Sequence, residues 1–288
     1  LGDQRRQPER LTWPFHVVLS SSIPAATEKI IVRMARHVKT QTGMDRLCMA
    51  GGVALNCTAN SVLLNEGVFE DIYIEPAAGD AGGAVGAALY AHYKLTDSPR
   101  TPQPFFGIGP AFDSQAESFL NENGIPFREG TREQQLRRLA AAIASGQIAG
   151  FYQGGAEFGP RALGFRSILA DPRDNCMKEK INAAVKYREP FRPFAPAVMR
   201  EHAAEYFECD REAPYMLFNF TVREDKRAVI PAVTHADNSS RIQTVSERDN
   251  PVLYRLLAKF QALTGVPVLL NTSFNLRGHP IVNTPEDA

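Results

Sequence analysis

Two short apolar segments in the first hundred residues each run directly into a glycine-rich turn and then into helical spacing. The first is Leu47–Ala50, followed by Gly51 and Gly52. The second is Ile72–Ile74, followed by a turn at residues 76–83. Glycine lets the backbone turn sharply and approach a ligand closely, and a helix behind such a turn favours anions at its N-terminus. The repeated order of strand, turn and helix predicts an α/β fold.

A stretch rich in proline and glycine, residues 98–112, divides the chain. It holds four prolines and two glycines, which is typical of an extended linker. We therefore predict one domain over residues 1–97 and a second over residues 113–288. Apolar spacing predicts a helix over 25–39, further helices over 114–123, 132–145, 175–184 and 251–264, and strands over 147–152, 216–222 and 266–270.

The overall charge excludes some partners. Thirty-two basic and thirty-two acidic residues cancel, so the whole chain offers no electrostatic basis for binding nucleic acid or an anionic membrane. No apolar run has the ~20 residues of a membrane span, and no signal-peptide pattern opens the chain. The four cysteines show no CxxC spacing, so we expect reduced thiols and a cytoplasmic location. The first residue is Leu1 and a helix start is expected at Thr284, so we expect a fragment cut at both ends.

The segment Phe151–Arg200 is locally basic. Nine basic and five acidic residues give it a net charge of +4 on a neutral chain. Several of its arginines stand beside glycine, proline and phenylalanine, where a solvated helix face would show alternating charges instead. Arginine in such a setting suits bidentate contacts with phosphate. We assign four residues to anion binding and leave Lys178 and Lys180 on the surface; the four are Arg161, Lys186, Arg188 and Arg192.

Three further turns carry weaker signals. Gly51 and Gly52 suit phosphate binding with Asn56 as a ligand contact, and equally suit a tight turn that packs closely. Asp80 suits a metal or a ribose hydroxyl, and the alternative is a helix cap. The short polar side chains of residues 271–275 could bind a phosphate or build an ordinary turn.

Five segments together resemble one family, the O-carbamoyltransferases of the NodU/CmcH type. In chain order they read GGVALNCTAN, PAAGDAGGAVGAAL, GPRALGFRSILADPR, KYREPFRPFAPAV and LLNTSFNLRGHPI. The resemblance implies an α/β protein built from the C-terminal part of a TsaD-like domain, of the actin/hexokinase type, followed by a YrdC-like domain. It also implies the substrates carbamoyl phosphate and ATP and a hydroxyl acceptor. Carbamoyl phosphate and ATP would give carbamoyl-adenylate and pyrophosphate, and the carbamoyl group would pass to the acceptor.

The same resemblance assigns roles to individual residues. The Lys-x-Arg signature of the YrdC-like domain falls on Lys186 and Arg188, and its Ser-x-Asn signature on Ser273 and Asn275. The basic pocket for carbamoyl phosphate and ATP carries over to three arginines, Arg161, Arg192 and Arg241. The nucleotide loop of the TsaD-like domain falls on Gly51, Gly52 and Asn56, and its metal-binding aspartate falls on Asp80.

The cofactor expectations are Mg²⁺ with ATP and an iron-type metal at Asp80. The family's two histidine ligands lie upstream and no HxxxH pair occurs in this chain, so we expect weak or no metal binding. We also expect no carbamoyl transfer by this chain alone. A homodimer is compatible with these features. Two other functions stay open: a modification enzyme of the tRNA threonylcarbamoyladenosine type, which a basic tRNA-binding face would indicate, and a noncatalytic nucleotide-binding regulator.

Overall fold

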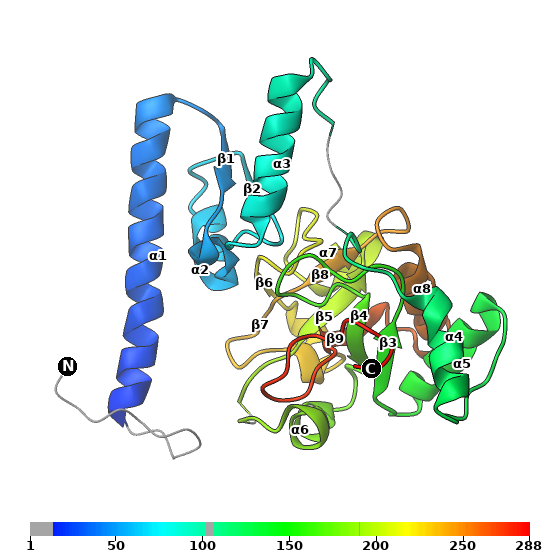
Figure 1. The fold of residues 1–288 in the computed structure, drawn as a ribbon. Coiled ribbons are helices and arrows are strands. Elements are labelled where there is room, and N and C mark those ends of the chain that lie inside the picture. The colour runs from blue at the N-terminus through cyan, green and yellow to red at the C-terminus, as the bar shows by residue number, and fades with distance from the viewer. Residues whose placement is uncertain (1–13, 102–105, 190) are drawn as a thin grey trace.

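The computed structural model describes residues 14–101, 106–189 and 191–288. In its first part, a long helix precedes two parallel strands that each lead into a helix (Figure 1). The elements are α1 (Pro14–Thr42), β1 (Arg46–Met49), α2 (Cys57–Asn65), β2 (Asp71–Ile74) and α3 (Gly82–Leu95), with a 3₁₀ turn at Gly52–Leu55. The predicted repetition of strand, glycine turn and helix is confirmed.

The second part contains a mixed five-stranded sheet in the order β3-β4-β9-β5-β8. All neighbouring strands are antiparallel except β5 and β8, which are parallel. The strands are β3 (Ala149–Tyr152), β4 (Arg166–Ala170), β5 (Ala195–Met199), β8 (Gln243–Val245) and β9 (Val268–Ser273). A separate pair joins β6 (Phe220–Thr221) and β7 (Ser239–Ser240). The α/β class is therefore confirmed, while the TsaD-like and YrdC-like arrangement stays a prediction.

The helices of the second part are α4 (Asp113–Glu122), α5 (Arg132–Ala144), α6 (Met177–Ile181), α7 (Ala203–Tyr206) and α8 (Pro251–Thr264). Helices α5 and α8 pack against each other and contact strands of this sheet. Thr131 opens α5 with a capping box, and Asn250 caps α8 before Pro251. No helix within the described ranges is both long and apolar enough to cross a membrane.

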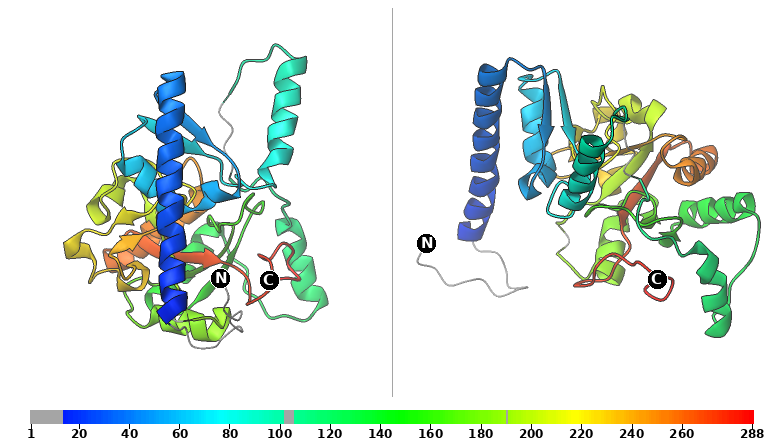
Figure 2. Two further views of the ribbon diagram at one scale, coloured as in Figure 1. Left: turned by 90° about the vertical axis from the view of Figure 1, so that its left-hand side faces the viewer. Right: turned by 45° about the horizontal axis from the view of Figure 1, so that its top comes forward.

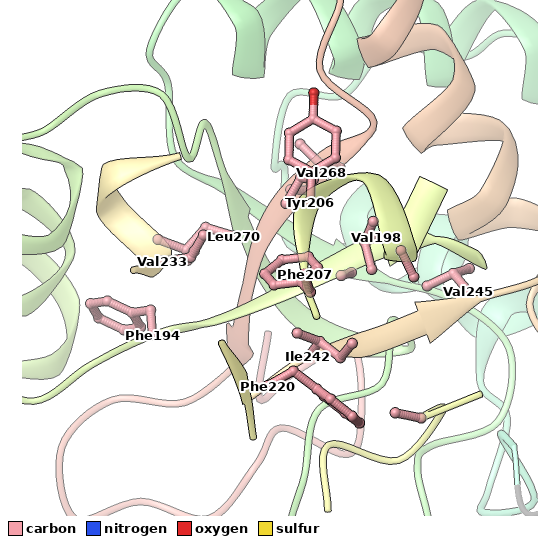
Figure 3. Close-up of a cluster of buried hydrophobic side chains, with 14 of the residues drawn as sticks. Phe194, Val198, Tyr206, Phe207, Phe220, Val233, Ile242, Val245, Val268 and Leu270 are labelled. Carbon is pink, nitrogen blue, oxygen red and sulfur yellow. The ribbon is translucent and has the colours of Figure 1, made fainter. Parts of the chain in front are cut away.

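The core of the second part lies against the central strands. Figure 3 shows buried side chains of β5, β8 and β9 meeting those of the segment 206–233, with Phe207 and Ile242 in the middle. Both of these side chains are fully buried. Burying a large apolar side chain contributes roughly 1.5–3 kcal/mol. This core therefore fixes the strands whose ends carry the site described below.

Several sequence-based expectations need correction. The predicted strand over 216–222 is mostly wrong: only Phe220 and Thr221 form a strand, Val222 makes an isolated bridge to Phe207, and Met216 has a left-handed φ of 56°. The predicted helix over 175–184 breaks into α6 and a π-helical turn at Asn182–Lys186. Strands β4, β5 and β8 were not predicted. The expected helix at 284 is a turn, in which Asp287 accepts hydrogen bonds from two backbone amides.

Residues at the end of the 98–112 stretch form backbone hydrogen bonds with the second part. The Gly109 amide donates to the Ala156 carbonyl at 2.9 Å, and Ala111 bridges to Gly155. Residues 102–105 of the predicted linker lie outside the described residues. The end of the stretch is thus held against the second part, while Thr101 contacts Tyr93 of α3, and the domain boundary itself stays a prediction.

The two parts touch through α2 and the loop after β2. Figures 1 and 2 show α1 on the outer side, with α2 between it and the second part. The Asn60 amide donates to the Leu217 carbonyl at 3.0 Å, and the Ser61 hydroxyl donates to the Asn219 carbonyl at 3.0 Å. Asn60 is fully buried, so this contact is part of the packed structure.

Gly159 marks a second close approach between the parts. Its φ is +136°, and a Cβ at this position would lie 2.6 Å from the carbonyl oxygen of Pro76. Gly159→Ala should therefore lower the free energy of unfolding by about 1–3 kcal/mol in urea denaturation. Gly146→Ala is the control, because Gly146 also has a positive φ, +87°, but open space around it. Equal losses in the two variants would contradict a role for the Pro76 contact.

Candidate active site

The four residues of the two predicted signatures are brought to one place by β9 and the π-helical turn. Lys186 ends that turn, and Tyr187 behind it has a left-handed φ of 43°. The Lys186 ammonium donates to the Ser273 carbonyl at 2.5 Å and to Asn275 Oδ1 at 2.7 Å. The Ser273 hydroxyl donates to Asn275 Oδ1 at 2.6 Å. Residues that lie 87 positions apart in the chain thus form a single cluster.

Lys186 is a buried cation without a carboxylate among the hydrogen-bond partners described for it. Only 6% of the residue is exposed, and its acceptors are two carbonyls, a hydroxyl and an amide oxygen. Burial, followed by the nearby charge of Arg188, lowers the pKa of Lys186 to about 8. A neutral acceptor set leaves the positive charge available for an anionic ligand.

Arg188 is fixed beside this cluster by three contacts. Its Nε donates to Asn182 Oδ1 at 2.8 Å, its Nη2 donates to the Pro193 carbonyl at 3.4 Å, and its guanidinium lies 4.7 Å from the ring centroid of Phe194. Burial lowers the pKa of Arg188, and the charges of Arg192 and Arg241 lower it further. Arg188 therefore links the lysine cluster to a wider group of cations.

That group lines a cavity of about 600 Å³ between the two parts of the chain. Four arginines from three segments face it: Arg161, Arg188, Arg192 and Arg241. Burial and the charge of Arg241 lower the pKa of Arg161 to about 10. The Nε atoms of Arg161 and Arg241 are buried and have no hydrogen-bond partner within the described residues. Mutual repulsion of this kind is relieved when an anion binds.

Little negative charge offsets these arginines. Among the described lining residues Asp237 is the one carboxylate, and Ser239 donates two hydrogen bonds to it. Arg192 forms an ion pair with Glu189 at 2.9 Å, with about half of the arginine side chain still exposed. The excess of positive charge agrees with anion binding.

Several lining residues were not predicted, among them Cys57, Thr58 and His235. Cys57 and Thr58 come from the start of α2, so the first part of the chain supplies one wall of the cavity. His235 also lines it, with Nε2 3.3 Å from the Phe194 carbonyl, and burial lowers the pKa of this histidine. Cys57 and Thr58 lie within the segment GGVALNCTAN but were given no role there, and His235 lies outside the five segments.

The glycine turns of the first part face a different cavity. Gly51 and Asp80 line a space of about 830 Å³ beside β2 and α3. The Gly51 amide donates to the Ala78 carbonyl at 2.6 Å, which ties the two turns together. Gly52 and Asn56 do not line this cavity, and Asn56 Oδ1 instead accepts from the Ala59 amide at 3.2 Å as the N-cap of α2. The structure thus gives Asn56 a capping role.

Asp80 does not build a metal centre with its neighbours in this chain. The residue is exposed, and no group of three or more histidine, cysteine, aspartate or glutamate residues in the described ranges is placed to hold a metal ion. The described residues of this chain alone therefore do not complete a site for an iron-type metal.

The fold is of the α/β class, and four arginines line one cavity. Two family models place the chain more closely: Carbamoyltransferase N-terminus matches residues 3–89 and Carbamoyltransferase C-terminus matches residues 140–288. The chain belongs to the carbamoyltransferase family, which is a family of enzymes.

Named relatives agree with this assignment. The chain is 44% identical to nodulation protein NolO of Bradyrhizobium diazoefficiens, over 98% of this chain and 53% of the relative. It is 37% identical to 3'-hydroxymethylcephem-O-carbamoyltransferase of Amycolatopsis lactamdurans, over 84% of this chain and 44% of the relative. The chain therefore spans about half the length of these relatives. Among solved structures, HypF aligns with 56% of the chain and 20% of its own at 14% identity and a TM-score of 0.38, too low to define the fold.

Proposed function

We propose that the protein containing this chain is an ATP-dependent O-carbamoyltransferase, and that the arginine cavity is where the carbamoyl group is activated. The convergence of four arginines on one cavity, next to the Lys186 cluster, carries the proposal. Two polyanions, carbamoyl phosphate and ATP, repel each other and need such a concentration of cations to bind together. The acceptor would be a hydroxyl of a small molecule or glycan, because one relative is named for carbamoylating a hydroxymethyl group.

The proposed activation consumes one water. The water releases inorganic phosphate from carbamoyl phosphate and leaves carbamate. A carbamate oxygen then attacks the α-phosphorus of ATP, a P–O bond forms, the bond to the β-phosphate oxygen breaks, and pyrophosphate leaves with the electron pair. The products are carbamoyl-adenylate, pyrophosphate and phosphate. The acceptor hydroxyl finally attacks the carbamoyl carbonyl, loses its proton and displaces AMP.

Each cation has a place in this scheme. Lys186 and Arg188 would stabilise the negative charge that develops on the transferring phosphoryl group, with Ser273 and Asn275 orienting the ammonium. Three further arginines, Arg161, Arg192 and Arg241, would hold the phosphate chain. Mg²⁺ would accompany ATP as its counter-ion. The cavity of Gly51 and Asp80 is the candidate place for transfer to the acceptor, with groups from the remainder of the protein.

Exchange of labelled pyrophosphate into ATP tests the proposal in the full-length protein. The exchange should require carbamoyl phosphate, since pyrophosphate can return only to an adenylate. Absence of exchange under conditions where ATP binds would overturn the proposed chemistry and favour a nucleotide-binding regulator. The same preparation should show no salt-dependent shift of tRNA in a gel.

Removal of Arg161 should weaken binding of the phosphate chain. One hydrogen bond to a charged group contributes about 1.5–3 kcal/mol, so Arg161→Ala should raise the Kd for ATP roughly 10- to 100-fold in calorimetry. Arg255→Ala is the control, because Arg255 is exposed on α8 and pairs with Glu247 at 3.6 Å. An unchanged Kd for Arg161→Ala would remove this arginine from the ligand site.

A further inference from the structure

Asn182 lies beneath Arg188 and has no role in any of the motifs. It is the first residue of the π-helical turn that ends at Lys186, and only 3% of it is exposed. Its Oδ1 accepts the Nε proton of Arg188 at 2.8 Å. Its Nδ2 is buried and has no hydrogen-bond partner among the residues described. Burying an amide NH2 group without an acceptor costs free energy of folding, so the presence of an asparagine at this position calls for an explanation.

The chain offers a comparison in Arg173, whose guanidinium is also held by a side chain. There the acceptor is the carboxylate of Asp171, which takes Nε at 3.0 Å and Nη2 at 2.6 Å. That carboxylate raises the pKa of Arg173 and neutralises its charge locally. Arg173 therefore has a structural role. Because Asp171 neutralises its charge, it contributes little electrostatic attraction for a ligand.

Arg188 is held by neutral groups instead. Its contacts are the Asn182 amide oxygen, the Pro193 carbonyl and the Phe194 ring. Its pKa is lowered by burial and by neighbouring arginines, and Glu189 has the smallest effect among the charges that act on it. The guanidinium is therefore immobilised while its charge stays largely uncompensated.

We propose that Asn182 is a positioning residue of the activation site: it fixes the guanidinium of Arg188 through a neutral acceptor and so preserves the full positive charge for the phosphate groups of the substrate. This proposal rests on the function proposed above, since it places Arg188 beside the transferring phosphoryl group. It also explains why an amide, and not a carboxylate, stands at this place. An aspartate would make a stronger hydrogen bond to Arg188 but would cancel the charge that the ligand needs.

Asn182→Asp separates this role from a merely structural one. Aspartate keeps an oxygen acceptor of the same size, so a structural role predicts unchanged stability and unchanged ligand binding. The proposal predicts an unchanged Tm but a Kd for inorganic pyrophosphate raised at least about tenfold, with KM for ATP raised in parallel and kcat lowered as well, because Arg188 acts on the transferring phosphoryl group. The control is Asn175→Asp, which adds the same charge at an exposed position seven residues earlier in the chain.

Asn182→Ala completes the comparison. It should lower kcat, because Arg188 loses its orientation, yet raise the Kd for pyrophosphate less than Asn182→Asp does. A Kd for pyrophosphate in Asn182→Asp equal to that of the wild type would overturn the proposal. So would equal increases of this Kd in Asn182→Asp and Asn175→Asp. Pyrophosphate binding in calorimetry does not depend on carbamoyl chemistry. Wild-type protein that binds pyrophosphate but fails the exchange assay would therefore refute the proposed function and not the role of Asn182.

Discussion

Lys186→Ala is expected to reduce carbamoyl-phosphate-dependent pyrophosphate exchange by roughly 10²- to 10³-fold, the size of effect seen when one preorganised donor to a developing anion is removed. The ammonium is already fixed by Ser273 and Asn275, so it needs no rearrangement when the negative charge develops. Lys180→Ala is the control, because Lys180 is half exposed and pairs with Asp174 at 2.6 Å. Equal rates for wild type and Lys186→Ala would exclude Lys186 from the chemistry.

The pH dependence gives a second test of the same residue. Since the pKa of Lys186 in the free protein is about 8, the residue is charged below this pH and neutral above it. If the cation is the active form, kcat/KM for the donor should fall as the pH rises through about 8. Lys186→Arg should keep a reduced rate without this decline, because arginine stays protonated throughout the range. A decline that persists in Lys186→Arg would belong to another group.

The sequence was a good guide to the residues at the ends of strands. Glycine turns after apolar runs predicted both strand-to-helix turns of the first part, because they depend on local backbone freedom and on short-range periodicity. Lys186, Arg188, Ser273 and Asn275 were predicted through resemblance, and the structure places them together. Their proximity could not be derived from spacing, since it depends on how β9 lies relative to the π-helical turn.

The order of the strands in the sheet could not be predicted from local sequence patterns. β5 contains Pro196, which lacks an amide proton and would normally indicate an edge strand or no strand. Here β5 lies between β9 and β8, and Pro196 stands opposite Leu270. All five residues of β5 are buried, and the packing of their side chains outweighs the preference of proline for an edge strand. Asn182 was missed for a related reason, since a single asparagine inside a helical pattern has no signal of its own.

Arg166 shows how a basic segment can conceal a core residue. It belongs to the locally positive stretch of the sequence, yet it is fully buried in the structure. Its guanidinium donates to the carbonyls of Gln153 at 2.8 Å, Gly154 at 3.0 Å and Pro110 at 3.3 Å. It also lies 3.6 Å from the ring centroid of Tyr152. Through these hydrogen bonds the guanidinium joins the end of β3, the start of β4 and the segment before α4.

Arg166→Ala should therefore lower the free energy of unfolding by about 3–5 kcal/mol, the range for breaking a buried charged network. The substitution leaves a cavity and several buried carbonyls without donors, and urea denaturation measures the loss. Arg166→Lys should recover only part of it, because one ammonium cannot reach all of the carbonyls that a planar guanidinium serves.

Arg200→Ala is the matched control, since Arg200 is half exposed and pairs with Glu212 at 2.8 Å, and it should change stability by less than about 0.5 kcal/mol. If Arg166→Ala were as stable as Arg200→Ala, the guanidinium would not hold the segment before α4 against the sheet. Hydrogen exchange at residues 106–112 should accelerate in Arg166→Ala and not in Arg200→Ala, because only the first variant removes the donor to Pro110.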